Sequence, residues 1–295
     1  MPSAYTTLIS VAQLRELQKQ PKDLLLFDCS FDLVQPDAGL AQYQAGHIPG
    51  ALYAHLNRDL SAAHAGTSGG GAHAAASGGR HPLPTRAAFA AWLGSCGLRP
   101  GMQAVVYDRQ GANYCGRLWW MLKWLGHAEA AVLDGGLQAW ERAGAGLSTE
   151  TTQPLAAAPY PMADALLPLV DVASVMHRLG HADQHILDAR ASARYRGEVE
   201  PLDPVAGHIP GALNRPFGSN LDSDGRFKPA EQLRAEFAAL LGTRSSAHVV
   251  HHCGSGVSAI PNLLAMEIAG LHGSALFAGS WSEWCSDPSR PVARG

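Results

Sequence analysis

The sequence lacks a strong charge of either sign, and it lacks long apolar runs. Charged residues make up 16% of its 295 residues, and the net charge is −3 at neutral pH. Because so weak a field attracts neither nucleic acid nor an anionic membrane surface, neither is expected as a partner. The first residues, MPSAYTTLISVAQLREL, hold no basic region followed by an apolar core, and no run is long enough to span a bilayer. We therefore expect a cytoplasmic protein.

Cysteine is scarce, and its spacing is irregular. The five cysteines show no CxxC or CxxH pattern, which makes a zinc site or a disulfide framework unexpected. We accordingly expect no metal and no cofactor. Four of these residues are expected to be small buried apolar side chains in a reducing compartment. The fifth, Cys253, stands in a different context.

An internal repeat organises the chain. The segment at 46–52 reads GHIPGAL and returns unchanged at 207–213. Further on, AVVYDRQGANYCGRLWWML aligns with HVVHHCGSGVSAIPNLLAM, and VLDGGLQAW aligns with LFAGSWSEW at the same offset. The three blocks keep their order in both halves, which predicts two copies of one domain.

The repeat also sets the predicted domain boundaries and the fold class. We place the first domain at residues 1–148, a proline-containing linker at 149–163 and the second domain at 164–295. Each half alternates short apolar runs with amphipathic segments. This alternation predicts an α/β fold in which each domain is a mainly parallel sheet with helices on both faces. A glycine- and alanine-rich stretch at 61–79 has no counterpart in the second half.

Cys253 follows an apolar run and opens a glycine-containing loop, CGSGVS, that leads into a helical segment. It is therefore expected at the carboxyl end of a strand, where ligands bind in such sheets. Gly254 and Gly256 allow the amides of 254–258 to turn toward the sulfur, and these amides stabilise a thiolate. The aligned first-half residue is Arg109, which has no thiol, so only the second domain is expected to be catalytic. The alternative is a buried structural cysteine.

Several motifs together resemble the tandem-domain rhodaneses over nearly the whole chain: the paired GHIPGA segments, DAR and RYRGE before the second one, the CGSGVS loop and the terminal GSWSEW. The resemblance implies a sulfurtransferase whose second domain carries the catalytic cysteine, while the first domain forms part of the cleft wall. The loop is similar to that of 3-mercaptopyruvate sulfurtransferases, whereas thiosulfate-preferring members carry Arg and Lys after the cysteine. Gly254 and Ser255 occupy those two places here, which favours 3-mercaptopyruvate as donor and leaves thiosulfate as the alternative.

The resemblance also implies roles for single residues. Cys253 and Ser255 are expected to be catalytic, with Ser255 taking part in proton handling. Arg194 is expected to bind the donor carboxylate, and His81 is expected to reach the same site from the first domain. The second arginine that the resemblance leads us to expect is replaced by Asp203. The predicted substrate-binding set also includes the loop residues Gly254, Gly256, Val257 and Ser258.

We therefore predict a two-step transfer in which the Cys253 thiolate takes sulfur from the donor as a persulfide and passes it to a thiol or cyanide. A thioredoxin-like reductant is a further candidate partner. A phosphatase with a cysteine loop would need an arginine six places after the cysteine, and Ala259 stands there. A non-catalytic module that carries or senses persulfide is the other alternative. For the single residues, the alternatives are a solvated or ion-paired surface arginine at Arg194 and a surface or loop histidine at His81.

Overall fold

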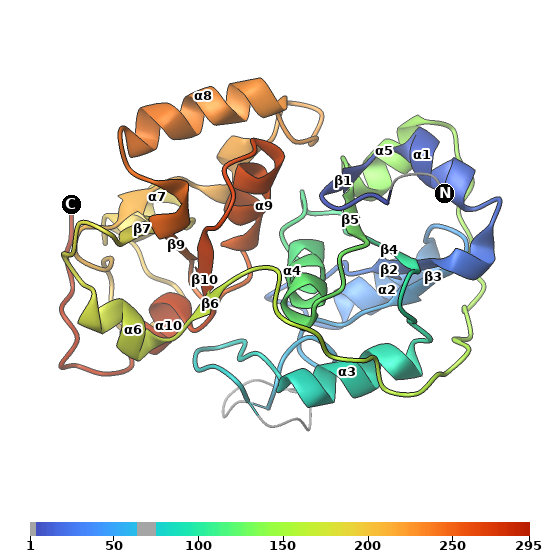
Figure 1. The fold of residues 1–295 in the computed structure, drawn as a ribbon, viewed down its shortest axis with the longest axis horizontal. Coiled ribbons are helices and arrows are strands. Elements are labelled where there is room, and N and C mark those ends of the chain that lie inside the picture. The colour runs from blue at the N-terminus through green and yellow to red at the C-terminus, as the bar shows by residue number, and fades with distance from the viewer. Residues whose placement is uncertain (1–3, 64–74) are drawn as a thin grey trace.

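The computed structural model describes residues 4–63 and 75–295. Most of the glycine- and alanine-rich stretch predicted at 61–79 lies outside these residues. The chain forms two α/β units, each built around a five-stranded parallel sheet, and the two units lie side by side in Figure 1. The predicted fold class is confirmed in both halves.

The sheet of the first half has the strand order β1-β5-β4-β2-β3. Its central strands are apolar runs that are buried on both faces, as expected for a parallel sheet covered by helices. The outer strands are only two and three residues long and were not predicted from the sequence. The strands are β1 (Leu8–Ile9), β2 (Leu24–Asp28), β3 (Ala51–Tyr53), β4 (Gln103–Tyr107) and β5 (Ala130–Leu133).

The sheet of the second half repeats this topology, with the order β6-β10-β9-β7-β8. Every pair of neighbouring strands is again parallel. Strand for strand, β6, β10, β9, β7 and β8 take the places of β1, β5, β4, β2 and β3, so the sequence repeat is a repeat of structure. The strands are β6 (Leu169–Val170), β7 (His185–Asp188), β8 (Leu213–Asn214), β9 (Val249–His252) and β10 (Ala275–Phe277).

Helices cover both faces of each sheet. Local sequence explains several of their starts: Ser10 and Gln13 form a capping box, and Thr85 and Asp171 cap two further helices with their side chains. The first half holds α1 (Val11–Leu17), η1 (Pro21–Asp23), α2 (Ala38–Ala45), α3 (Arg86–Ser95), α4 (Cys115–Leu125) and α5 (Gly136–Arg142). The second half holds α6 (Val172–His177), α7 (Ser192–Tyr195), η2 (Phe217–Asn220), α8 (Ala230–Leu241), η3 (Ser246–His248), α9 (Ile260–Ile268) and α10 (Ser280–Trp284).

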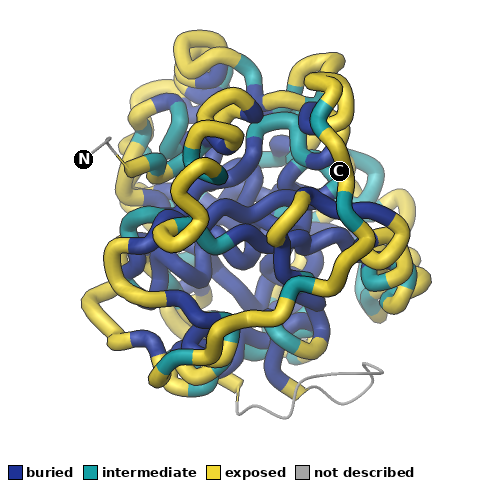
Figure 2. Tube along the Cα trace, turned by 90° about the vertical axis from the view of Figure 1, so that its right-hand side faces the viewer, coloured by how far each residue is buried: buried dark blue, intermediate teal, exposed yellow. Residues whose placement is uncertain are grey.

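The two halves share a hydrophobic core, because α4 and α9 pack against each other between the sheets (Figure 1). Every residue of α4 is buried, including Trp119 and Trp120, so this helix lies inside the protein. Figure 2 shows a buried centre surrounded mostly by exposed segments.

Between α5 and β6 the chain crosses from one half to the other. Its backbone bonds to the first half on the way: the amides of Ala157 and Tyr160 donate to carbonyls of α3, and that of Ala163 donates to the carbonyl of Leu125. The connection therefore lies along α3 and α4 rather than free in solvent. Among the described residues, no helix combines the length and apolar character that crossing a membrane requires.

Candidate active site

Cys253 is the first residue after β9, at the carboxyl edge of the second sheet, and its side chain is 2% exposed. Seven loop residues separate β9 from α9, whose first residue is Ile260. Two contacts from α10 hold the start of this loop: the amide of Trp281 donates to the Cys253 carbonyl at 3.0 Å, and the Cys253 amide donates to the Ser280 hydroxyl at 3.1 Å. The predicted order of strand, cysteine loop and helix is confirmed.

The loop holds a run of backbone amides without acceptors. Within residues 4–63 and 75–295, none of the amides of 254–259 donates a hydrogen bond, although nearly all of these residues are buried. Buried donors of this kind are rare and normally have a partner. Gly256 makes the turn possible because its φ is +74° and a Cβ there would overlap the carbonyl oxygen of Ala278. The loop is therefore built to receive an anion beside Cys253.

Strand register identifies the first-half counterpart of Cys253 and corrects the sequence alignment. In the first sheet Asp28 pairs with Tyr107, and in the second Asp188 pairs with His252. The residue after Tyr107 is Asp108, whose carbonyl accepts the amide of Leu137 just as the Cys253 carbonyl accepts that of Trp281. The counterpart of Cys253 is therefore Asp108, and not Arg109. The conclusion that the first half carries no thiol at this place is unchanged.

Asp108 shows what this loop does with a negative charge. One carboxylate oxygen accepts the amides of Gln110 and Ala112 at 2.9 and 3.0 Å, and the other accepts those of Tyr114 and Cys115 at 2.8 and 2.9 Å. The first half thus closes the same loop around its own carboxylate. In the second half the equivalent loop surrounds a sulfur atom.

Two arginines, one from each half, lie beside the cysteine loop. A Cβ placed on Gly254 would lie 3.1 Å from Arg80 Nη2 and 3.5 Å from Arg194 Nη1. Arg194, which the sequence analysis assigned to the donor carboxylate, comes from α7, whereas Arg80 comes from the first half and was not singled out in the sequence. Both are paired with acids: Arg194 with Glu200 and Asp203, and Arg80 with Asp203. Burial raises the pKa of the Asp203 carboxyl above its usual value, and the two arginines oppose that effect.

His81 and Ser255 meet in this site. The Nδ1 atom of His81 lies 2.7 Å from the Ser255 hydroxyl, and both residues are buried. The sequence therefore correctly brings a first-half histidine to the cysteine loop.

Arg117, a residue of α4, lies beneath the loop and was missed by the sequence analysis. It is fully buried and donates to the carbonyls of Gly256 and His81 at 3.2 and 3.0 Å. Burial lowers the pKa of its guanidinium to about 9, while the negative charge of a Cys253 thiolate acts in the opposite direction. In the described part of the chain no acidic side chain forms an ion pair with Arg117. A buried cation of this kind favours an anion nearby.

The remaining predicted residues have simpler places. Val257 belongs to the shared hydrophobic core, so only its backbone can face a ligand, and Ser258 is half-buried. His251 and His252 are both fully buried on β9, and His252 Nε2 lies 3.6 Å from the Asp188 carboxylate. Leaving these two histidines out of the predicted site agrees with their positions. Among the described residues, no group of three or more side chains suited to hold a metal ion lies together.

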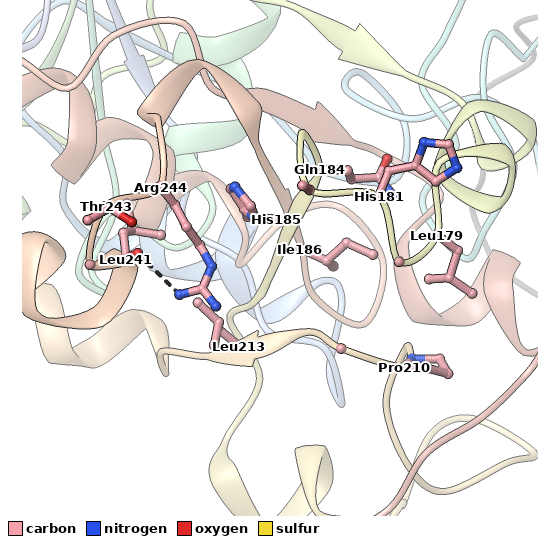
Figure 3. A pocket seen from close by; sticks show the side chains of 14 residues that line it. Leu179, His181, Gln184, His185, Ile186, Pro210, Leu213, Leu241, Thr243 and Arg244 are labelled. Carbon is pink, nitrogen blue, oxygen red and sulfur yellow. Dashed lines mark hydrogen bonds between the residues drawn. The ribbon is translucent and has the colours of Figure 1, made fainter.

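A large surface hollow lies at the other edge of the second sheet. It has a volume of about 750 Å³ and is bordered by the first residues of β7 and β8 and by the end of α8 (Figure 3). Arg244 enters it, and its guanidinium donates to the Leu241 carbonyl at 3.1 Å. Cys253 lies at the opposite, carboxyl edge, so this hollow is separate from the cysteine loop.

Comparison with known proteins gives a consistent result. The family model of the rhodanese-like domain matches residues 10–143 and again 171–287. The chain is 47% identical over 290 residues to a probable 3-mercaptopyruvate sulfurtransferase of Pseudomonas aeruginosa, with 98% of each chain covered. It is 39% identical to a putative thiosulfate sulfurtransferase, SseB, of Mycobacterium tuberculosis, covering 98% of this chain and 97% of that protein. Among solved structures it is similar to SseA of Escherichia coli, which is described as a 3-mercaptopyruvate sulfurtransferase with the rhodanese fold. The two sequences are 29% identical, and the TM-score is 0.77 over 94% of this chain and all of that one.

Proposed function

The chain belongs to the rhodanese family of sulfurtransferases, and we propose that it moves sulfur from 3-mercaptopyruvate to a thiol or cyanide through a persulfide on Cys253. The observation that carries this proposal is the buried ring of loop amides beside Cys253. In the first half the equivalent amides bind the Asp108 carboxylate. They are therefore suited to stabilise a thiolate or a persulfide anion in the second half.

In the first step the Cys253 thiolate attacks the sulfur atom of the donor. A sulfur–sulfur bond forms, the carbon–sulfur bond of the donor breaks, and its electron pair leaves as the enolate of pyruvate. The enolate takes one proton and becomes pyruvate. The hydrogen-bonded pair of His81 and Ser255, 2.7 Å apart beside the loop, is placed to deliver that proton.

In the second step the acceptor attacks the outer sulfur of the persulfide. The sulfur–sulfur bond breaks, and its electron pair returns to Cys253 as a thiolate. Cyanide leaves as thiocyanate, and a thiol leaves as a persulfide of the acceptor. A thioredoxin-like dithiol would take the sulfur with its first thiol and release it as hydrogen sulfide when its second thiol closes a disulfide. All five cysteines are free thiols, which suits a reducing compartment such as the cytoplasm.

Arg194 gives the donor a permanent positive charge to bind. Its guanidinium lies beside Gly254, one residue from the attacking sulfur, and a planar guanidinium matches the shape of a carboxylate. Thiosulfate is the alternative donor, favoured by the relative named as a putative thiosulfate sulfurtransferase. It carries two negative charges, whereas Asp203 and Glu200 already balance the charges of Arg80 and Arg194 beside Gly254.

The test compares thiocyanate formation from 3-mercaptopyruvate and from thiosulfate, with cyanide as acceptor, in one preparation of the protein. We expect a higher kcat/KM with 3-mercaptopyruvate, and we expect a Cys253→Ser variant to lose turnover of both donors. A matched Cys96→Ser variant should keep full activity because Cys96 is a free thiol at the end of α3 in the first half. Full activity of Cys253→Ser would refute the persulfide mechanism, and a clear preference for thiosulfate would refute the donor.

A further inference from the structure

Arg117 is a buried cation of the first half that reaches the cysteine loop of the second. It is the third residue of α4, and its side chain is fully buried. Its guanidinium donates to the Gly256 carbonyl in the loop at 3.2 Å and to the His81 carbonyl at 3.0 Å. The residue before it, Gly116, allows α4 to approach α9 closely, because a Cβ there would lie only 3.2 Å from a side chain of α9. A positive charge therefore lies under the cysteine loop.

The contact with Gly256 sets the direction of the next amide. In a planar trans peptide the carbonyl and the amide that follows it point in opposite directions, so a Gly256 carbonyl bonded to Arg117 turns the Val257 amide away from that guanidinium. The counterpart of this amide in the first half is that of Ala112, which donates to the Asp108 carboxylate at 3.0 Å. In the second half the catalytic cysteine takes the place of that aspartate. The Val257 amide is therefore directed toward the sulfur.

The other charged groups near the loop balance one another. Three arginines are each paired with acids among the described residues: Arg80 with Asp203, Arg190 with Asp188 and Glu200, and Arg194 with Glu200 and Asp203. His252, on the strand that leads into the loop, is fully buried, and burial lowers its pKa, so this histidine is neutral at neutral pH. These groups together leave no net charge to offset a thiolate.

Arg117 differs from these arginines because its charge has no acidic partner within residues 4–63 and 75–295. Its third contact, at 3.4 Å, is to the carbonyl of Leu60. The neighbouring Asp59 carboxylate accepts the His55 amide at 2.7 Å. The ionisable group whose charge acts on Arg117 is Cys253. A buried guanidinium and a buried sulfur are thus left to neutralise each other.

The corresponding helix of the second half makes no such contact. Asn262 stands nine residues after Cys253, as Arg117 stands nine residues after Asp108. Asn262 is buried and neutral, and it donates to the Arg215 carbonyl at 2.8 Å within its own half. The loop around the Asp108 carboxylate therefore receives no cation from α9, whereas the loop around the cysteine receives one from α4.

We propose that Arg117 is a positioning residue for Cys253: it supplies the buried positive charge that offsets the charge of the thiolate, and it directs the Val257 amide toward the sulfur. This inference rests on the proposed function because it concerns the same thiolate. It gives the half without a nucleophile a part in activating the nucleophile of the other half. A nearby opposite charge favours the ionised form of a group, and burial strengthens this effect because little water screens the two charges.

The test follows thiolate formation with pH, measured as the ultraviolet absorbance of each protein minus that of the same protein carrying Cys253→Ala. Arg117→Gln removes the charge but keeps an N–H donor for the Gly256 carbonyl. In this variant the pH midpoint of thiolate formation should rise by about 1 to 2 units, because the thiolate loses its opposite charge. An unchanged midpoint would overturn the inference.

Arg117→Lys separates the charge from the shape of the side chain. Lysine keeps the positive charge but lacks the planar group that bonds to two carbonyls at once. Its midpoint should stay within about half a pH unit of the wild type. A rise of about one unit or more in Arg117→Lys contradicts the role of the charge, and this comparison with the wild type stands even where Arg117→Gln does not fold.

A matched control is Lys123→Met, which removes another buried cation from the same helix. Lys123 donates to the Ala128 carbonyl near the end of α4, and burial lowers its pKa to about 8. This variant should leave the midpoint unchanged. A rise equal to that in Arg117→Gln would show that any disturbance of α4 moves the midpoint, which contradicts a specific role for Arg117.

These titrations need neither a donor nor an acceptor, so they separate the inference from the proposed function. A raised midpoint in Arg117→Gln supports the inference even if 3-mercaptopyruvate fails as a donor. Sulfur transfer by the wild type together with an unchanged midpoint in Arg117→Gln contradicts the inference alone and leaves the proposed function in place.

Discussion

The two halves of the molecule use one loop in two ways. In the first half the loop after the central strand closes around Asp108, and Arg109 bonds to Asp28, Ser30 and the Gly46 carbonyl at 2.9, 2.5 and 2.6 Å. In the second half Cys253 takes the place of the aspartate, and Gly254 takes the place of the arginine. The first loop is thus filled by its own side chains, while the second leaves its amides and the space above Gly254 to a ligand.

The two halves also differ in how they neutralise the buried aspartate at the end of the neighbouring strand. Asp28 is neutralised by Arg109 from the loop, whereas Asp188 is neutralised by Arg190, two residues along its own chain, at 2.6 Å. Arg190 also stacks on Trp281, with 4.7 Å between the guanidinium carbon and the ring centre. Because Arg190 neutralises Asp188, the loop of the second half needs no arginine at the position of Arg109, and Gly254 can stand there. The loop of the second half is therefore open, while the ion pair that braces the sheet is kept.

The largest effect is expected from making the second loop resemble the first. A Cys253→Asp variant should lose sulfur transfer completely because a carboxylate cannot carry a persulfide. Its carboxylate should instead accept the free loop amides, so its melting temperature should lie above that of Cys253→Ala, which leaves those amides buried without an acceptor. Thiocyanate formation and thermal unfolding measure the two parts. A Cys253→Asp variant less stable than Cys253→Ala would show that the second loop does not bind anions as the first does.

Much of this arrangement could be predicted from the sequence. The GHIPGAL repeat located both domains, and its histidines behave alike: His47 stacks on Tyr43 at 3.9 Å between ring centres, and His208 stacks on Tyr195 at 3.8 Å. Local patterns also placed Cys253 after a strand, because a short apolar run followed by glycines in an α/β fold usually indicates a strand that ends in a tight loop.

The alignment of the two loops was one residue wrong because matching Val-Val pairs dominated it. The glycines carry the better signal, since Gly111 and Gly256 have φ of +68° and +74° and each stands three residues after Asp108 or Cys253. Arg80 was missed for a different reason. Its position beside Gly254 depends on how the two halves pack together, which no local pattern records.

A smaller effect is expected from adding one methyl group to each loop glycine. Gly256→Ala should destabilise the protein by about 2 to 4 kcal/mol, because it combines a left-handed backbone with overlap of the fixed Ala278 carbonyl. Gly111→Ala has similar strain, but its Cβ would meet only the end of the Leu221 side chain, at 2.6 Å, which can move. It should cost about 1 to 2 kcal/mol. Chemical denaturation measures both, and equal losses would mean that backbone strain alone sets the cost.

The smallest difference concerns pH. His251 on β9 stands where register places Val106 on β4, and burial lowers the pKa of His251 to about 3. Above the unfolded pKa of about 6.5, His251 is neutral in the folded and the unfolded state, so it does not make stability depend on pH. As the pH falls below about 6.5, only the unfolded chain takes up the proton. The protein therefore loses stability until the pH reaches about 3, where the folded protein is protonated as well. At pH 5 the loss is about 2 kcal/mol. When the pH is lowered from 7.5 to 5, a His251→Val variant should therefore lose less stability than the wild type. Denaturation curves that shift equally with pH in both proteins would show that His251 is not the source of acid sensitivity.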